Sequence, residues 1–137
     1  MGQRRRAREC ALQMLFQIEL GGQAPAEACE QFWHGQEASS ELRAFAEQLV
    51  HGVCAARVEL DRLIATSTEH WRIERMAVVD RNILRIAAFE LLHGADTPAA
   101  VVIDEAIEVA KKFGSAESGA FINGILDAIV RRAQEAR

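Results

Sequence analysis

Long apolar runs are missing from this sequence, and so are the marks of a secreted chain. No stretch approaches the roughly 20 consecutive apolar residues that a membrane-spanning helix needs. The N-terminus is basic, but no apolar segment follows it, so we expect no secretory signal peptide. The three cysteines are odd in number, lie far apart and form no CxxC pair. They indicate a protein of the reducing cytoplasm, without a disulfide framework.

Motifs for catalysis and for cofactor binding are also missing. The sequence has no glycine-rich phosphate loop, no nucleophile with a placed base and no cluster of metal ligands. His51 and Cys54 have i, i+3 spacing on an expected helix, but two ligands do not make a zinc site, and a structural role is favoured for both. The sequence therefore predicts a protein that is not an enzyme and that holds neither a cofactor nor a metal.

Half of the 137 residues are hydrophobic, which is enough to form the core of one compact domain over residues 1–137. Charge is distributed unevenly along this chain. The formal net charge is −4, yet four of the sixteen basic residues are Arg4, Arg5, Arg6 and Arg8, so the remainder carries twelve basic against twenty acidic residues. An acidic body with a basic arm at residues 1–9 predicts one local contact with a polyanion.

Apolar residues recur at helical spacing along most of the chain, and no strand-like alternation competes with them. Ser39 or Ser40 can cap one helix, and Thr97 can cap another with Pro98 at its first position. The sequence predicts an all-α protein with helices over residues 4–20, 25–33, 40–66, 71–94, 98–113 and from 118 onward. Gly52 is a weak point in the third helix and is expected to mark a bend.

The segment 71–94 is expected to be the central helix. Its apolar arc is wider than one neighbour can cover, so other helices should pack on at least two sides. Asp80 and Glu90 fall on that arc, where a buried charge needs a partner. They are separated by roughly 15 Å along the helix axis, which excludes one shared proton-transfer site.

Four segments in order make the chain resemble the NusB family of transcription antitermination factors. They are RRRARECALQMLF, DRNILRIAAFELL, VIDEAIEVAKKFG and SGAFINGILD. The resemblance implies two small helical bundles that share a central helix-rich interface. It also implies a scaffold that binds single-stranded boxA RNA of nascent ribosomal RNA together with NusE, a small-subunit ribosomal protein, and thereby serves the RNA polymerase antitermination complex. The alternatives are a module related to the N-terminal domain of RNA cytosine methyltransferases, and a protein-interaction domain without RNA binding.

The arginines lie at the start of a helix, where they oppose the positive end of the macrodipole. We therefore expect Arg4, Arg5, Arg6 and Arg8 to form a disordered arm that becomes ordered on RNA phosphates. A solvated charge run is the alternative. Phe16, further along the same helix, either packs against a second layer of helices or offers a stacking platform for a base.

The junction between the last two helices is the second RNA contact that the resemblance implies. It comprises Phe113, Glu117, Ser118 and Phe121. Core packing is the alternative for both phenylalanines, and Ser118 can serve as a helix N-cap. Phe121 has the small Gly124 beside it, which would permit close approach of another backbone, so Gly124 is expected to be structural.

The central helix carries the expected protein-binding residues Glu74, Asp80 and Arg81, which the resemblance places toward NusE. Glu90 is expected to be structural and to accept hydrogen bonds from backbone amides near the start of the following helix. Homodimers that bury the RNA surface occur in parts of the family, so a homodimer is a further possibility.

Overall fold

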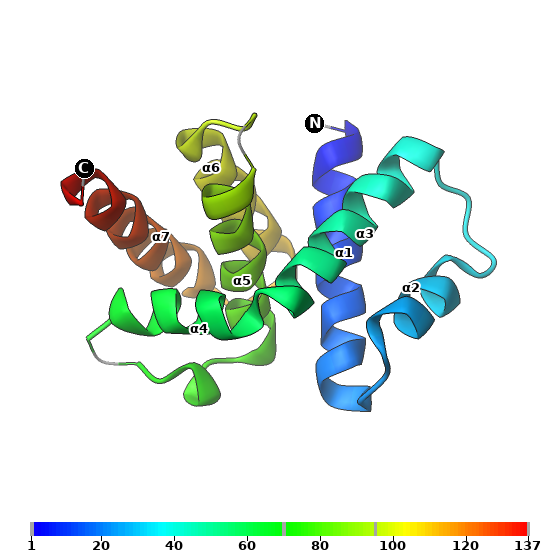
Figure 1. The fold of residues 1–137 in the computed structure, drawn as a ribbon, viewed down its shortest axis with the longest axis horizontal. Coiled ribbons are helices and arrows are strands. Elements are labelled where there is room, and N and C mark those ends of the chain that lie inside the picture. Colours follow the sequence, from blue (N-terminus) through cyan, green and yellow to red (C-terminus); the bar gives the residue numbers. More distant parts are fainter. Residues whose placement is uncertain (1, 70, 95, 137) are drawn as a thin grey trace.

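The computed structural model describes residues 2–69, 71–94 and 96–136, and every regular element within these ranges is a helix. The all-α prediction is therefore confirmed. None of these helices combines the length and the apolar character of a membrane span. The elements in chain order are α1 (Gly2–Gly21), α2 (Pro25–Trp33), α3 (Ser40–Ala55), α4 (Arg57–Thr66), the 3-10 turn η1 (Ile73–Arg75), α5 (Val78–His93), α6 (Ala99–Phe113) and α7 (Ser118–Glu135) (Figure 1).

The helices form two bundles that meet at α5. Helices α1, α2 and α3 pack together on one side, and α4, α6 and α7 surround α5 on the other (Figure 1). Helix α5 also packs against α1 and α3, so it belongs to both bundles. The expectation that this helix is central, with neighbours on at least two sides, is confirmed.

Two helices occupy the span expected to be one, because the chain bends at Ala56. That residue has φ −100° and ψ 14°, and its amide donates to the carbonyl of Gly52 at 3.0 Å. The bend therefore follows Gly52 rather than falling on it. Gly52 itself lies where α3 crosses α5, and a Cβ added there would overlap the ring of Phe89. The absent side chain permits this crossing.

Residues 71–77 were expected to be helical, and this prediction is wrong. The central helix begins only at Val78, and the residues before it form η1. The Nη1 atom of Arg81 donates to the carbonyls of Ile73 and Met76 at 3.4 and 3.0 Å, so these carbonyls are satisfied outside a helix. Ile73 and Met76 are buried, which fixes the turn against the core.

The predicted starts of α3 and α6 agree with the structure to within one residue. Ser39 caps α3, because its Oγ accepts from the amide of Leu42 at 3.1 Å. Pro98 was expected at the first position of α6 with Thr97 as the cap. Instead Pro98 is the cap residue, and its carbonyl accepts from the amides of Val101 and Val102.

Buried ion pairs join α1 to α5 at two levels. Near the start of α1, Arg8 donates from Nε and Nη2 to the two carboxylate oxygens of Glu90, both at 2.8 Å. Near its end, Glu19 accepts from Arg81, from Asn82 and from Arg85. Residue numbers rise along α1 while those of the partners fall, so the two helices run antiparallel.

The partner expected for Glu90 was therefore wrong, although the side chain is buried. Its carboxylate binds a guanidinium from α1 and not the backbone amides at the start of α6. A residue 82 positions away supplies the charge, which local sequence could not reveal.

Candidate nucleic-acid interface

The basic arm is helical in this structure. Helix α1 begins at Gly2, and two of its arginines are held by carboxylates of the other bundle. Arg5 donates to both oxygens of Glu105, at 3.0 and 2.7 Å, and Arg8 binds Glu90. The prediction of a disordered arm is wrong, because these carboxylates offset the repulsion between the arginines and the positive end of the helix dipole. The hydrogen bond from Arg5 also lowers the pKa of Glu105.

Arg4 and Arg6 are the exposed members of the arginine group. The guanidinium of Arg4 lies 4.4 Å from the centre of the Phe45 ring. Arg6 lies 3.8 Å from Glu9, a loose contact that a phosphate can replace. The four expected RNA contacts thus divide into two cations at the surface and two committed to the fold.

An apolar hollow of about 330 Å³ lies further along α1. Its lining comes from α1, α2, α5 and α6 and consists of Leu12, Gln13, Phe16, Gln17, Phe32, Val79 and Phe113. Phe16 is 37% exposed, so its ring lies at the surface and not in a second core layer. Two of the three phenylalanines expected to meet RNA, Phe16 and Phe113, are brought to the same hollow although they come from opposite ends of the chain.

Lys112 connects the hollow with the cations, and sequence analysis missed it. Its Nζ lies 3.1 Å from an oxygen of Glu9 and 5.5 Å from the centre of the Phe113 ring. Arg6 contacts the same carboxylate. The only sequence signal was the lysine pair that precedes Phe113 and Gly114 at the end of α6. We call Arg6, Lys112, Phe16 and Phe113 the basic–aromatic surface; Arg4 lies against Phe45 of α3 and is not part of it.

The predicted junction residues serve different purposes. Ser118 is 1% exposed, and its Oγ donates to Asp80 at 2.7 Å and accepts from the Ser115 amide at 2.9 Å. Its side chain is therefore part of the fold and does not reach a ligand, in contrast to the prediction. Glu117 is exposed and accepts from the Ser115 hydroxyl at 3.2 Å.

Phe121, the third phenylalanine expected to meet RNA, does not line the hollow that contains Phe16 and Phe113. Its ring packs edge to face against Trp71, with 5.4 Å between centroids. Gly124, expected to permit a close backbone approach, is exposed, and a Cβ there would meet nothing within 4 Å. That prediction is wrong. Gly52 is instead the glycine at which a side chain would overlap a neighbour, the ring of Phe89.

The expected protein-binding residues are not equally accessible. Glu74 is exposed and lines an open hollow of about 730 Å³ together with the exposed Trp71. Arg81 lines the same hollow, but its guanidinium is already bound to Glu19 and to carbonyls of the turn before α5. Asp80 is half-buried and accepts from Ser118, so its carboxylate already has a partner within the chain.

A charge network that sequence analysis did not find lies beneath this second hollow. Arg85 donates to Glu19 at 2.8 Å and to Asp61 at 2.7 and 3.1 Å. Burial raises the pKa of Glu19, but hydrogen bonds from Arg81, Asn82 and Arg85 outweigh burial and hold that pKa at about 2. Asn82 and Arg85 are both buried, although each is polar or charged.

Comparison with known proteins identifies the relatives of this fold. The model of the NusB family matches residues 5–131. The chain belongs to the NusB family. Its relatives include the "Transcription antitermination protein NusB" of Sorangium cellulosum, 47% identical over 129 residues that cover 94% of this chain and 92% of the relative. The protein of the same name from Desulfatibacillum aliphaticivorans is 48% identical over 129 residues, with 94% and 90% covered.

Solved structures of NusB have the same architecture. T. maritima NusB superposes with a TM-score of 0.84 at 37% identity, covering 93% of this chain and 90% of that one. A chain from the "Crystal Structure of Antitermination Factors NusB and NusE in complex with dsRNA" superposes with a TM-score of 0.87 at 26% identity, with 96% and 98% covered. The two-bundle arrangement expected from the NusB resemblance is thus confirmed.

Proposed function

We propose that this protein is a transcription antitermination factor that binds boxA-like RNA together with NusE and acts as a scaffold without turnover. The observation that carries the proposal is the basic–aromatic surface, in a chain 47% identical to a NusB antitermination protein. Cations beside exposed aromatic rings suit RNA, because phosphates bind the charges while unpaired bases stack on the rings.

Single-stranded RNA is the form that this surface favours. A base can enter the hollow between Phe16 and Phe113 only when it is not stacked in a duplex. Phe16 lacks a hydroxyl, so it supports stacking alone. The relative solved with dsRNA indicates that duplex RNA can also meet members of this family, and RNA of both forms belongs in the test.

The second hollow suits the protein partner. Exposed Trp71 supplies apolar area, and the exposed Glu74 can meet a basic side chain of the partner. The hollow also holds the arginines Arg57, Arg62, Arg72, Arg81 and Arg85, which would meet acidic groups of that partner. Through NusE the protein would join the antitermination complex of RNA polymerase. Antitermination takes place in the cytoplasm. A reducing compartment of this kind fits the three free thiols, which belong to Cys10, Cys29 and Cys54.

The test is a titration of labelled boxA RNA, single-stranded and duplex, with and without saturating NusE. NusE should tighten RNA binding, and RNA should tighten NusE binding by the same factor. Replacing Arg6 and Lys112 by Ala should reduce RNA affinity and flatten its salt dependence by roughly 1.4 in the logarithmic slope. Equal affinity with and without NusE would contradict the proposed joint assembly.

The matched control is Arg131→Ala. Arg131 is an exposed arginine on α7, outside the basic–aromatic surface, and its loss removes a similar charge. Phe16→Ala should weaken single-stranded RNA by about 1–3 kcal/mol without changing the salt slope. If Arg131→Ala weakens RNA as much as either substitution does, binding is a general effect of charge and the assigned surface is wrong.

A further inference from the structure

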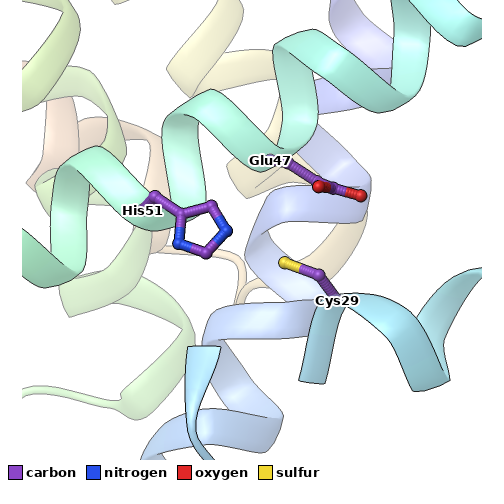
Figure 2. Close-up of side chains that lie close together, drawn as sticks. All are labelled: Cys29, Glu47 and His51. Atoms are coloured by element: carbon purple, nitrogen blue, oxygen red, sulfur yellow. The ribbon is translucent and has the colours of Figure 1, made fainter. Parts of the chain in front are cut away.

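Three side chains with metal-binding chemistry meet between α2 and α3, away from the basic–aromatic surface. They are Cys29 on α2 and Glu47 and His51 on α3, and one ligand atom from each lies within 4.8 Å of the others. Figure 2 shows Cys29 rising from α2 toward the two side chains of α3. Cys29 is buried, Glu47 is half-buried and His51 is exposed, so the cluster spans the boundary between core and solvent.

The spacing of the two α3 residues presents them together. Glu47 and His51 are separated by one helical turn, i and i+4, and so lie on one face. Sequence analysis paired His51 with Cys54 instead, because the contribution of Cys29 depends on how α2 packs. The ligand set of thiolate, imidazole and carboxylate is one that Zn²⁺ takes in tetrahedral sites.

The geometry requires only a small adjustment to hold an ion. Ordinary Zn–S and Zn–N bonds put sulfur and nitrogen about 3.5 Å apart in a tetrahedral site. The present separations are at most 4.8 Å, and small rotations of the side chains, which are least restricted for the exposed His51, can close the difference. A fourth position opens into a hollow of about 580 Å³ that Glu30 and His34 also line.

A supporting hydrogen bond already orients the carboxylate. The buried Trp33 donates from Nε1 to Oε2 of Glu47 at 2.7 Å. That bond leaves the other carboxylate oxygen for a ligand bond. Donors in this position fix the direction of a metal ligand and raise metal affinity. Near charges are balanced, since Arg43 and Glu30 both line the hollow.

We propose that Cys29, Glu47 and His51 bind one Zn²⁺ ion, with water or His34 in the fourth position, and that the ion fixes α2 to α3. On binding, the Cys29 thiol releases its proton to solvent as the Zn–S bond forms. In this proposal the bound ion has a structural role and does not contact the RNA. It cross-links a short helix, α2, which packs mainly against α1 and α3.

The first experiment uses the whole, reduced protein after treatment with a chelator. Equilibrium dialysis against micromolar Zn²⁺ should show uptake of one equivalent per chain. Substitution with Co²⁺ should give a thiolate-to-cobalt charge-transfer band in the near ultraviolet together with the strong visible bands of four-coordinate cobalt. Zn²⁺ should also raise the thermal midpoint, because it binds the folded state.

Variants assign the ligands. His51→Ala is the primary variant, because the side chain is exposed and its loss should leave the fold intact. It should reduce Zn²⁺ affinity at least about tenfold, as should Glu47→Gln. Cys29→Ser should abolish the charge-transfer band, whereas Cys54→Ser, the matched thiol outside the cluster, should retain it. Trp33→Phe should weaken affinity about tenfold while keeping the band.

The outcomes decide the proposal. No uptake of one equivalent by the wild-type protein overturns it, and so does a charge-transfer band that persists in Cys29→Ser. Unchanged Zn²⁺ affinity in His51→Ala removes His51 from the site and overturns the assigned ligand set. RNA titrations on His51→Ala should match the wild type, which separates this inference from the proposed function.

Discussion

Arg8 and Glu90 form a two-bond ion pair, with both nitrogen-to-oxygen distances 2.8 Å, at the boundary between the two helical bundles. Arg8 is 5% exposed and Glu90 is 4% exposed, so water solvates neither charge well. Removal of Arg8 leaves the buried Glu90 carboxylate without its partner, and removal of Glu90 leaves Arg8 only its longer contact with Glu105 at 3.5 Å. The pair therefore fixes the start of α1 against α5.

Glu90→Ala should lower the free energy of unfolding by about 3–5 kcal/mol, and Arg8→Ala should lower it similarly. The double variant Arg8→Met/Glu90→Leu should lose much less free energy of unfolding than the two single variants lose together, because it removes both charges of the pair. Urea denaturation followed by circular dichroism gives all three values.

Glu108→Ala is the matched control for that prediction. Glu108 pairs with Lys111 at 3.2 Å on the exposed face of α6, and the loss of such a pair should change stability by less than about 1 kcal/mol. Additive losses in the double variant would show that Arg8 and Glu90 do not stabilise one another.

Acid should weaken the protein through Glu19. Its pKa is about 2 in the folded state against 4.5 ordinarily, so the unfolded chain takes up the proton first as pH falls. The stabilisation is complete above about pH 4.5 and is lost as the pH falls toward 2. It amounts to roughly 3 kcal/mol.

Glu19→Gln is the variant that isolates this effect. It should be less stable than the wild type at pH 7, and the difference should shrink as the pH falls below 4.5, because the wild-type carboxylate becomes protonated. Urea unfolding between pH 7 and the acid limit measures the difference. A gap that is constant across this range would rule out the titration of Glu19 as its source.

Two glycines in helices should respond to alanine in opposite directions. Gly52→Ala should destabilise the protein by about 1–3 kcal/mol, because the new methyl group overlaps Phe89. Gly124→Ala should stabilise it by about 0.5–1 kcal/mol, because the site is open and alanine is the better helix former. Phe89→Leu should relieve part of the cost in Gly52→Ala. Thermal unfolding compares the variants, and a neutral Gly52→Ala would contradict the crossing described.

Asp80→Ala should reduce stability by about 1–3 kcal/mol, because the buried Ser118 hydroxyl loses its acceptor. Asp80→Asn keeps an acceptor oxygen and should cost less. The contact between Asp80 and NusE stays a prediction, and NusE titration of the Asn variant tests it without the loss of structure. Full NusE affinity in that variant would leave Asp80 with a structural role alone.

Local features of this fold were predictable from sequence because their causes are local. Ser39 beside a helical run predicts a cap, and the span of α2 follows from Pro25 and the apolar spacing after it. The bend at Ala56 and the turn before Val78 have no such local cause. The turn depends on hydrogen bonds from Arg81, and nothing in the sequence around Ala56 sets the bend there.

The candidate sites were predictable only in part, for the same reason. Charged and aromatic residue types could be chosen from sequence, but their partners come from distant segments. Arg5 and Arg8 looked like free cations until Glu105 and Glu90 were placed beside them. Lys112 gained its place next to Phe113 and Glu9 only through the packing of α6 on α1.

The antiparallel pairing of α1 with α5 has a consequence for synthesis on the ribosome. Arg8 is made 82 residues before Glu90. At roughly 5–20 residues per second, the first helix waits about 4–16 s for its counter-charge. Throughout that interval its cationic start and its apolar face leave the exit tunnel without their partner, which makes the nascent N-terminal segment a natural client for chaperones that shield exposed apolar surface.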